Sequence, residues 1–218
     1  MSKLYSDHHR TLQDQFDTRR MADFMEGAML HGEFAPDEKA FIEGRDMFFL
    51  STVDAQGRPT VSYKGGAPGF VRITEPSTLV FPSYNGNGMH YSMGNILDAP
   101  RVGLLFIDFE TPHRLRVHGN ASLSFDAPLL AEYPEAEYLV TVAVDEIWVN
   151  CPRYVHTYRK QTESKYVPKQ GCETPIPAWK RIDVVQPALA ATDQGKAAAH
   201  GGEITIEQYF EKVTKGEA

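Results

Sequence analysis

One lysine and two arginines, placed among glycines and apolar runs, are the residues of this sequence best suited to binding an anion. Lys64 stands where an apolar run meets the glycine-rich bend at residues 65–69. Arg114 and Arg116 alternate with apolar residues further along the chain. The segment Asn87-Gly88-Met89 precedes an expected helix, whose first N–H groups have no partner within the helix. A phosphate would satisfy the lysine, an arginine and the helix start together, because charged N–H donors bind phosphate oxygens well.

Each of these features also has a simpler explanation. Glycine-rich bends are most often only turns, and alternating arginines are more often a solvated strand face. Lys64 alone indicates nothing. Cys151 is compatible with a nucleophile, but a buried structural thiol is the commoner role of a free cysteine. The residue types by themselves therefore indicate a β-rich domain compatible with an anion site, in which no catalytic acid, base or nucleophile stands out.

The elements that must position these residues are mainly strands. Short apolar runs bounded by turn residues are typical of strands, and they occur at 47–53, 60–64, 70–73, 78–81, 101–109, 113–125 and 137–149. Helices are expected at about 91–97, near 128–133 and at 154–160. Strands in succession, without long helices between them, favour an antiparallel barrel or sandwich over a doubly wound parallel sheet.

The two ends of the chain have different patterns. Apolar residues spaced three and four apart predict helices at 7–16 and 18–30, and Pro36 begins a short third helix. We expect a helical extension over 1–45, the barrel over 46–160 and a C-terminal extension over 161–218. The N-terminal helices suit packing or a dimer contact, and a lid over a pocket is the alternative. Within the C-terminal extension, the Ala- and Gly-rich segment 187–202 predicts a flexible linker, and an amphipathic segment follows it.

Composition excludes several classes of function. The 218 residues carry a formal net charge of −7, which disfavours binding to nucleic acid or to an anionic membrane. No stretch approaches the roughly 20 apolar residues of a membrane span, and the polar start lacks the apolar core of a signal peptide. We therefore expect a cytoplasmic protein. Cys151 and Cys172 match no metal motif and are expected to be free thiols, so no metal site is predicted.

The order and spacing of several segments resemble one known family. The segments are Gly57–Gly66, Pro68–Arg72, Gly86–Leu97, Val102–Phe106, Leu115–Gly119 and Asn150–Tyr154. In this order they resemble the pyridoxamine 5'-phosphate oxidase-like FMN-binding split-barrel proteins, over about residues 41–158. The resemblance implies a mainly β, α+β fold: an antiparallel split β-barrel with N-terminal and peripheral helices.

The resemblance also implies a homodimer with two FMN molecules at the subunit interface. By matching positions, Val61, Ser62 and Lys64 would lie along the flavin and its phosphate. The neighbouring strand would contribute Phe81, Pro82 and Ser83, and Asn87, Gly88, Met89 and Ser92 would surround the ribityl phosphate. Arg114 would lie near the flavin ring, and Arg153 would reach the flavin from the partner subunit.

Two departures from the family pattern affect the expected function. Met89 and His90 stand where many relatives have an arginine or lysine, so more of the phosphate binding would depend on Lys64, arginines and backbone N–H groups. The C-terminal Arg-x-His-Arg-like pattern of true pyridoxamine phosphate oxidases is missing, which argues against vitamin B6 oxidation. The leading hypothesis is an FMN-dependent oxidoreductase that transfers hydride to or from a small molecule. The alternatives are a non-catalytic flavin or haem carrier or sensor, and a flavin-free barrel in an interaction protein.

Overall fold

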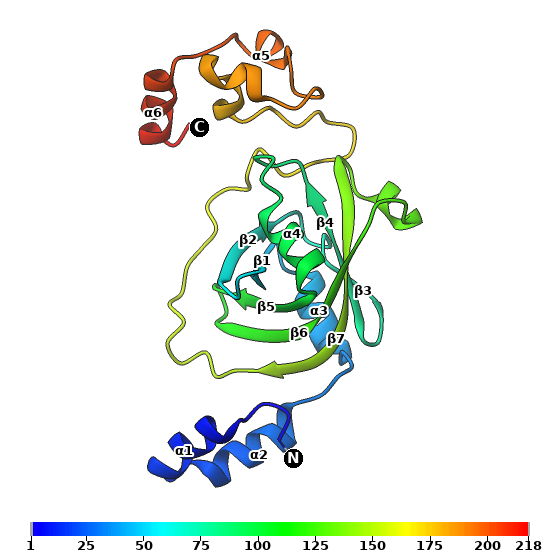
Figure 1. Cartoon of the computed structure of the whole chain (residues 1–218), viewed down its shortest axis with the longest axis vertical. Helices are drawn as coiled ribbons and strands as arrows, with labels where there is room; N and C mark the ends of the chain where they lie inside the picture. Colours follow the sequence, from blue (N-terminus) through cyan, green and yellow to red (C-terminus); the bar gives the residue numbers. More distant parts are fainter. Residues whose placement is uncertain (1, 218) are drawn as a thin grey trace. The chain divides into compact units, whose positions relative to one another are not determined.

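The computed structural model describes residues 2–217, and the chain divides into two compact units (Figure 1). The first unit comprises residues 1–85 and 90–159, and the second comprises residues 86–89 and 160–218. The N-terminal helices thus belong to the same unit as the sheet.

The first unit is built on one seven-stranded antiparallel sheet with the order β2-β1-β5-β6-β7-β4-β3. The strands are β1 (Met47–Val53), β2 (Pro59–Gly65), β3 (Arg72–Glu75), β4 (Thr78–Tyr84), β5 (Arg101–Asp108), β6 (His113–Ser124) and β7 (Ala136–Val149). Figure 1 shows the strands curving around a short helix, α4 (Tyr91–Asp98). The sheet is open between its edge strands β2 and β3. The predicted mainly β, split-barrel fold is confirmed, with the sheet unclosed.

Strand pairing decides which side chains face the core. Residues opposite each other in an antiparallel pair share a face, and successive residues alternate between faces. On β1, Phe48, Leu50 and Thr52 are buried while the residues between them are partly exposed. Phe48 packs against the rings of Phe81 and Phe106, with centroids 5.0 and 5.1 Å away. This aromatic cluster defines the inner face of the sheet.

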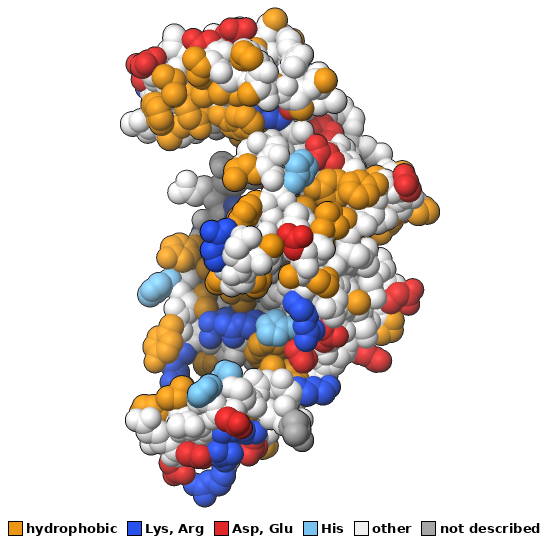
Figure 2. Space-filling view, viewed as in Figure 1, with side chains coloured by type: hydrophobic (Ala, Val, Ile, Leu, Met, Phe, Trp, Pro, Cys, Tyr) orange, Lys and Arg blue, Asp and Glu red, His pale blue; other side chains and the backbone are white. Residues whose placement is uncertain are grey.

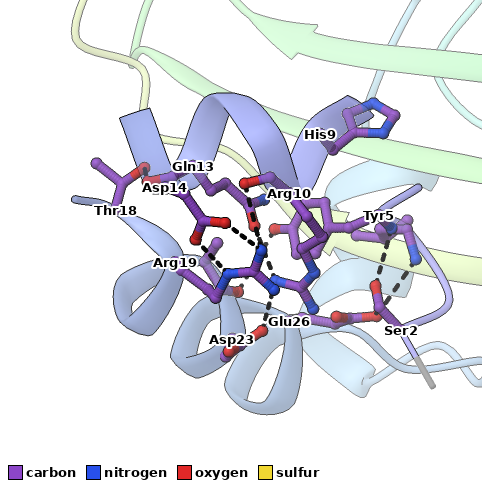
Figure 3. Close-up of polar contacts among 12 residues, drawn as sticks. Ser2, Tyr5, His9, Arg10, Gln13, Asp14, Thr18, Arg19, Asp23 and Glu26 are labelled. Atoms are coloured by element: carbon purple, nitrogen blue, oxygen red, sulfur yellow. Dashed lines mark hydrogen bonds and ion pairs between the residues drawn. The ribbon is translucent and has the colours of Figure 1, made fainter. Parts of the chain in front are cut away.

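Helices α1 (Asp7–Gln15) and α2 (Arg19–Met29) form a hairpin that precedes the barrel strands. Arg10 pairs with Asp23 across the hairpin at 2.6 Å, and Figure 3 shows this contact among the other polar contacts of the hairpin. The third helix, α3 (Pro36–Glu43), begins at the proline that predicted it. Helices α1 and α2 start and end within one residue of their predicted bounds, because capping and apolar spacing are local signals.

Three sequence predictions in this unit were wrong in detail. Residues 154–160 are irregular rather than helical. They are rich in β-branched and aromatic residues, which form helices poorly. Tyr154 is 84% exposed, and Tyr158 contacts the ring of Phe109, the residue after β5, with centroids 5.6 Å apart. Strand β3 begins at Arg72, since the buried residues Phe70 and Val71 lie in a bend. The segment predicted as a helix at 128–133 is a 3-10 helix, η1 (Pro128–Glu132).

The second unit contains short helices around a small core. They are η2 (Ala178–Arg181), η3 (Asp183–Ala188), α5 (Lys196–Ala199) and α6 (Ile206–Lys215). Ala178, Ile182 and Ile204 form the core. The segment 187–202, which the sequence predicts as a linker with little to bury, contributes buried Leu189, Asp193 and Ala197.

The amphipathic helix α6 leaves apolar side chains exposed at the surface of its unit. Ile206, Phe210 and Val213 are 44%, 59% and 47% exposed, whereas Tyr209 packs on the small core. In Figure 2 hydrophobic side chains gather over this end of the chain. Among residues 2–217 no helix has the length and hydropathy to cross a membrane.

Candidate functional site

Lys64 lies on the inner face of the sheet, at its edge. It is paired with the core residue Phe48 in the β1–β2 register, so its side chain is on the core side of β2. The side chain is half-buried, and this burial lowers the pKa of its ammonium group. No carboxylate in the described part of the chain forms an ion pair with it. A cation that is partly removed from water and has no acidic partner is favourably placed to bind an anion from outside the chain.

Helix α4 brings a second predicted residue close to β2. The Ser92 hydroxyl donates to Ser62 Oγ at 3.1 Å, and Ser62 Oγ donates to the Leu50 carbonyl at 3.5 Å. Ser62 lies two residues before Lys64 on β2, so both side chains are on the inner face. The structure therefore gathers Ser62, Lys64 and Ser92, three of the predicted site residues, at one edge of the barrel.

Residues that the sequence did not single out hold α4 in this position. Asn95 donates to Thr52 Oγ1 at 3.0 Å in the interior, which ties α4 to β1. The Tyr91 hydroxyl donates to Asp54 Oδ2 at 3.1 Å, which ties α4 to the β1–β2 turn. These contacts join residues about 40 positions apart, and no local pattern signals them.

The Asp54 carboxylate is fully used in this arrangement. It accepts from the Arg58 backbone N–H at 2.9 Å and from Gln56 N–H at 3.0 Å, and its other oxygen pairs with Arg58 Nε at 2.7 Å. The hydrogen bond from the Arg58 backbone N–H is the largest cause that lowers the pKa of Asp54, to about 2. The Arg58 side chain, the Gln56 N–H and the Tyr91 hydroxyl lower the pKa further, and burial opposes them. Asp54 is thus a structural anion rather than a base or a partner for Lys64.

The predicted loop Asn87-Gly88-Met89 is exposed and belongs to the second unit. Asn87 Oδ1 accepts the Met89 N–H at 3.1 Å, and Gly88 adopts a φ of 76°. The left-handed backbone at Gly88 explains the glycine there. That this loop and Lys64 bind one phosphate stays a prediction.

The other predicted positions on β2 and β4 have different surroundings. Phe81 is fully buried against Phe48, so its side chain is a core residue. Pro82 is buried and Ser83 half-buried, whereas Val61 is 65% exposed on the face opposite to Lys64. Phe81 can therefore contact a ligand only through its backbone, whereas the side chain of Ser83 stays partly accessible.

Arg114 and Arg116 lie on the outer face of β6, with the buried Leu115 and Val117 on the inner face. Arg114 Nη2 donates to the Cys151 carbonyl at 2.7 Å, and Arg116 donates to Asn150 Oδ1. Burial lowers the pKa of Arg116, and the like charge of Arg114 lowers it further. The Nε of Arg114 is buried and has no hydrogen-bond partner among residues 2–217. The solvated-face interpretation is therefore wrong for this pair, whose guanidinium groups are partly desolvated.

The prediction that one phosphate binds both Lys64 and one of the two arginines Arg114 and Arg116 is wrong within a single chain. They occupy opposite faces of the sheet, and β1 and β5 lie between their strands. At about 4.8 Å per strand the two strands are roughly 14 Å apart, too far for one phosphate to bridge on a common face. Arg153 is exposed beyond the end of β7, and Cys151 is exposed too rather than a buried thiol.

Comparison with known proteins agrees with the fold. The family model of pyridoxamine 5'-phosphate oxidase matches residues 34–150, more than half of the chain. The chain belongs to this family. In this member of the pyridoxamine 5'-phosphate oxidase family, every predicted site residue except Arg153 lies inside the matched range. The α1–α2 hairpin and the helices of the second unit lie outside that range.

Solved structures are similar at low sequence identity. HupZ of Group A Streptococcus is 19% identical, with 53% of this chain and 93% of that chain covered and a TM-score of 0.44. HutZ, the heme storage protein of Vibrio cholerae, is 23% identical over 54% and 94% of the two chains, with a TM-score of 0.40. General Stress Protein 26 of Bacillus anthracis is 19% identical over 50% and 88%, with a TM-score of 0.37. The search of curated proteins found no match.

Proposed function

We propose that this protein binds FMN and transfers hydride between the flavin and a small organic molecule. The observation that carries the proposal is Lys64, a half-buried cation without an acidic partner among the described residues. Family membership supports the same conclusion, because the matched range contains Lys64, Ser62 and Ser92.

The donor groups present fit a phosphorylated flavin. Lys64 would pair with the phosphate, and the hydroxyls of Ser62 and Ser92 are close enough to each other to bind its oxygens together. Arg114, with its unsatisfied Nε, would place positive charge near the ring or at a subunit contact. Because Lys64 and Arg114 lie on opposite faces, we propose a homodimer in which a second copy contributes to each site.

Bound FMN would supply the two-electron chemistry, while the protein sets orientation, access and charge. Lys64 anchors one end of the ligand, and the desolvated arginines keep positive charge on the outer face. No side chain is assigned as a general acid or base, and a hydride transfer of this kind does not require one. The electron donor is proposed to be NADH, NADPH or another small reductant in the cytoplasm.

The first experiment is the visible spectrum of protein purified without added cofactor. A flavin spectrum supports the proposal, whereas a haem spectrum would favour the carrier alternative, for which the heme storage protein HutZ is a precedent. Turnover of NADH or NADPH by the flavin-loaded protein would then separate an enzyme from a flavin carrier.

A titration with FMN tests the anchoring role of Lys64. Lys64→Ala should weaken FMN binding by about 10- to 100-fold, as expected for loss of a charge-assisted hydrogen bond. Lys39→Ala is the matched control, because Lys39 is in the same unit but already pairs with Glu43 and donates a hydrogen bond to the Ile73 carbonyl. Equal FMN affinity in the wild type and Lys64→Ala would place the phosphate elsewhere.

A further inference from the structure

The first unit contains a cavity of about 360 Å³ between the α1–α2 hairpin and the outer face of β6 and β7. Leu4, Met25, Met29 and Leu30 line it from the N-terminal segment, and Trp148 and Val149 line it from β7. The volume is at the lower end of the range of small-molecule sites, about 300 to 1,000 Å³. The cavity therefore has room for a ligand of one or two rings.

This cavity is separate from the proposed flavin phosphate site. Its β-sheet wall includes His118 and Trp148 of the outer face, which are paired with Glu146 and Arg116, and Val149 at the end of β7. Lys64 is on the inner face of β2, and β1, β5 and β6 lie between β2 and β7. Most of the remaining lining comes from residues before 34, outside the range that the family model matches. The cavity is thus a product of this chain's own N-terminal extension.

Glu26 fastens one wall of the cavity. Its Oε1 accepts hydrogen bonds from Lys3 N–H at 2.6 Å, Ser2 Oγ at 3.0 Å and Leu4 N–H at 3.3 Å, and Figure 3 shows Glu26 beside Ser2. Burial raises the pKa of Glu26, but these hydrogen bonds and the charge of Arg10 outweigh it and leave the pKa below 4.5. The ionised carboxylate therefore holds Leu4 and Tyr5 in place as lining residues.

His9 supplies a hydrogen-bond donor to the lining. Its Nδ1 accepts the Ser6 backbone N–H at 3.1 Å, so the proton of the neutral ring is on Nε2. On the opposite wall the His118 ring stands edge-on to Trp148, with centroids 4.7 Å apart, and its Nδ1 lies 3.4 Å from Glu146. The walls thus combine aromatic rings and thioethers with N–H donors, among them His9 and Trp148, and with the Glu26 carboxylate, which disfavours an anion.

We propose that this cavity binds an uncharged, planar aromatic molecule of one or two rings that carries a carbonyl oxygen. Trp148 and Tyr5 favour stacking with a flat ring, and the sulfurs of Met25 and Met29 make favourable contacts with aromatic edges. The carbonyl accepts the N–H of His9. The ionised Glu26 repels a carboxylate at the same place.

Calorimetric titration of the full chain with coumarin tests the site. Coumarin is planar, uncharged and carries a carbonyl, whereas coumarin-3-carboxylate adds a charge and 2-decalone lacks planarity. We expect coumarin to bind with FMN present or absent, and the other two to bind at least about fivefold more weakly. Absence of coumarin binding, or equal binding of 2-decalone, would overturn the proposal.

Two substitutions one helical turn apart locate the binding. Met25→Trp fills the cavity and should weaken coumarin binding about tenfold or more, because the ligand loses its apolar contacts. Met21→Trp is the matched control, since Met21 is 62% exposed on the same helix and does not line the cavity. An equal effect of both substitutions would show that the ligand binds elsewhere.

The His9 donor is tested independently of cavity filling. His9→Phe should weaken coumarin binding about 2- to 10-fold, the contribution of one hydrogen bond, and leave naphthalene binding unchanged. His9→Gln, which retains an N–H donor and the helix cap, should restore coumarin binding. Lys64→Ala should leave coumarin affinity unchanged, so failure of the flavin proposal and failure of this one give different results.

Discussion

Two desolvated lysines in different units of this protein have opposite surroundings. Lys180 in the second unit is 4% exposed, and its Nζ lies 2.6 Å from Asp193 Oδ2, whose side chain is also nearly buried. Lys64 in the first unit is half-buried, and no described carboxylate pairs with it. A buried charge normally costs free energy unless it is paired. Lys180 is therefore a structural residue, whereas Lys64 has the surroundings of a residue that meets an anion from outside the chain.

The largest expected effect comes from removing the buried ion pair between Lys180 and Asp193. Lys180→Met leaves the Asp193 carboxylate without its main partner and should lower the free energy of unfolding of the second unit by about 3–5 kcal/mol. Chemical denaturation followed by Trp179 fluorescence in a Trp148→Phe background measures this change. Lys196→Met is the control, because Lys196 lies 3.7 Å from Asp193 and is 45% exposed. A change below about 1 kcal/mol for Lys180→Met would place it with the weak surface pairs.

A second prediction concerns Asp54, a carboxylate near β2 whose hydrogen bonds make it a structural anion and not a partner of Lys64. Its hydrogen bonds lower the pKa from 3.8 to about 2, so they stabilise the folded state fully above about pH 4. This stabilisation should be lost as the pH falls from 3.8 to about 2. Asp54→Asn should be less stable at neutral pH and should lose less stability over that acid range. Denaturation at a series of acid pH values measures it, and parallel curves for both proteins would contradict the assignment.

A smaller effect is expected from removing the unpaired lysine. Lys64→Met should leave the free energy of unfolding of the FMN-free protein unchanged or raise it by up to about 1 kcal/mol, because an unpaired, partly buried ammonium is unfavourable. Denaturation without FMN measures it. A clear loss of stability would mean that Lys64 is as structural as Lys180.

The smallest effect is the alkaline pH dependence of the same pair of proteins. Because burial lowers the folded-state pKa of Lys64 below 10.5, the unfolded chain binds more protons between that pKa and 10.5. The stability of the wild type should therefore rise, relative to Lys64→Met, as the pH increases through this range. A constant difference between the two proteins would indicate that Lys64 is solvated in the folded state.

Local patterns predicted the elements better than the site. The β1 strand at Met47–Val53 has its predicted bounds, and α4 extends one residue beyond them, because alternation and capping act over a few residues. The contact of Ser92 with Ser62 joins two predicted site residues, yet Asn95 and Tyr91, which position α4, were not identified. Nothing in the neighbouring sequence of Asn95 or Tyr91 distinguishes them from any surface polar residue.

The sequence by itself determined where the strands lie along the chain and which side chains of each strand share a face. An alternating pattern with a period of two is local, so it can be read from neighbouring residues. The sequence also carried the family resemblance that the matched range confirms. Only the tertiary structure decided that β2 is an edge strand, that Lys64 and the arginines lie on opposite faces, and that the N-terminal helices enclose a cavity. These features depend on pairings between distant segments, which form to bury one shared core and leave no trace in the spacing of nearby residues.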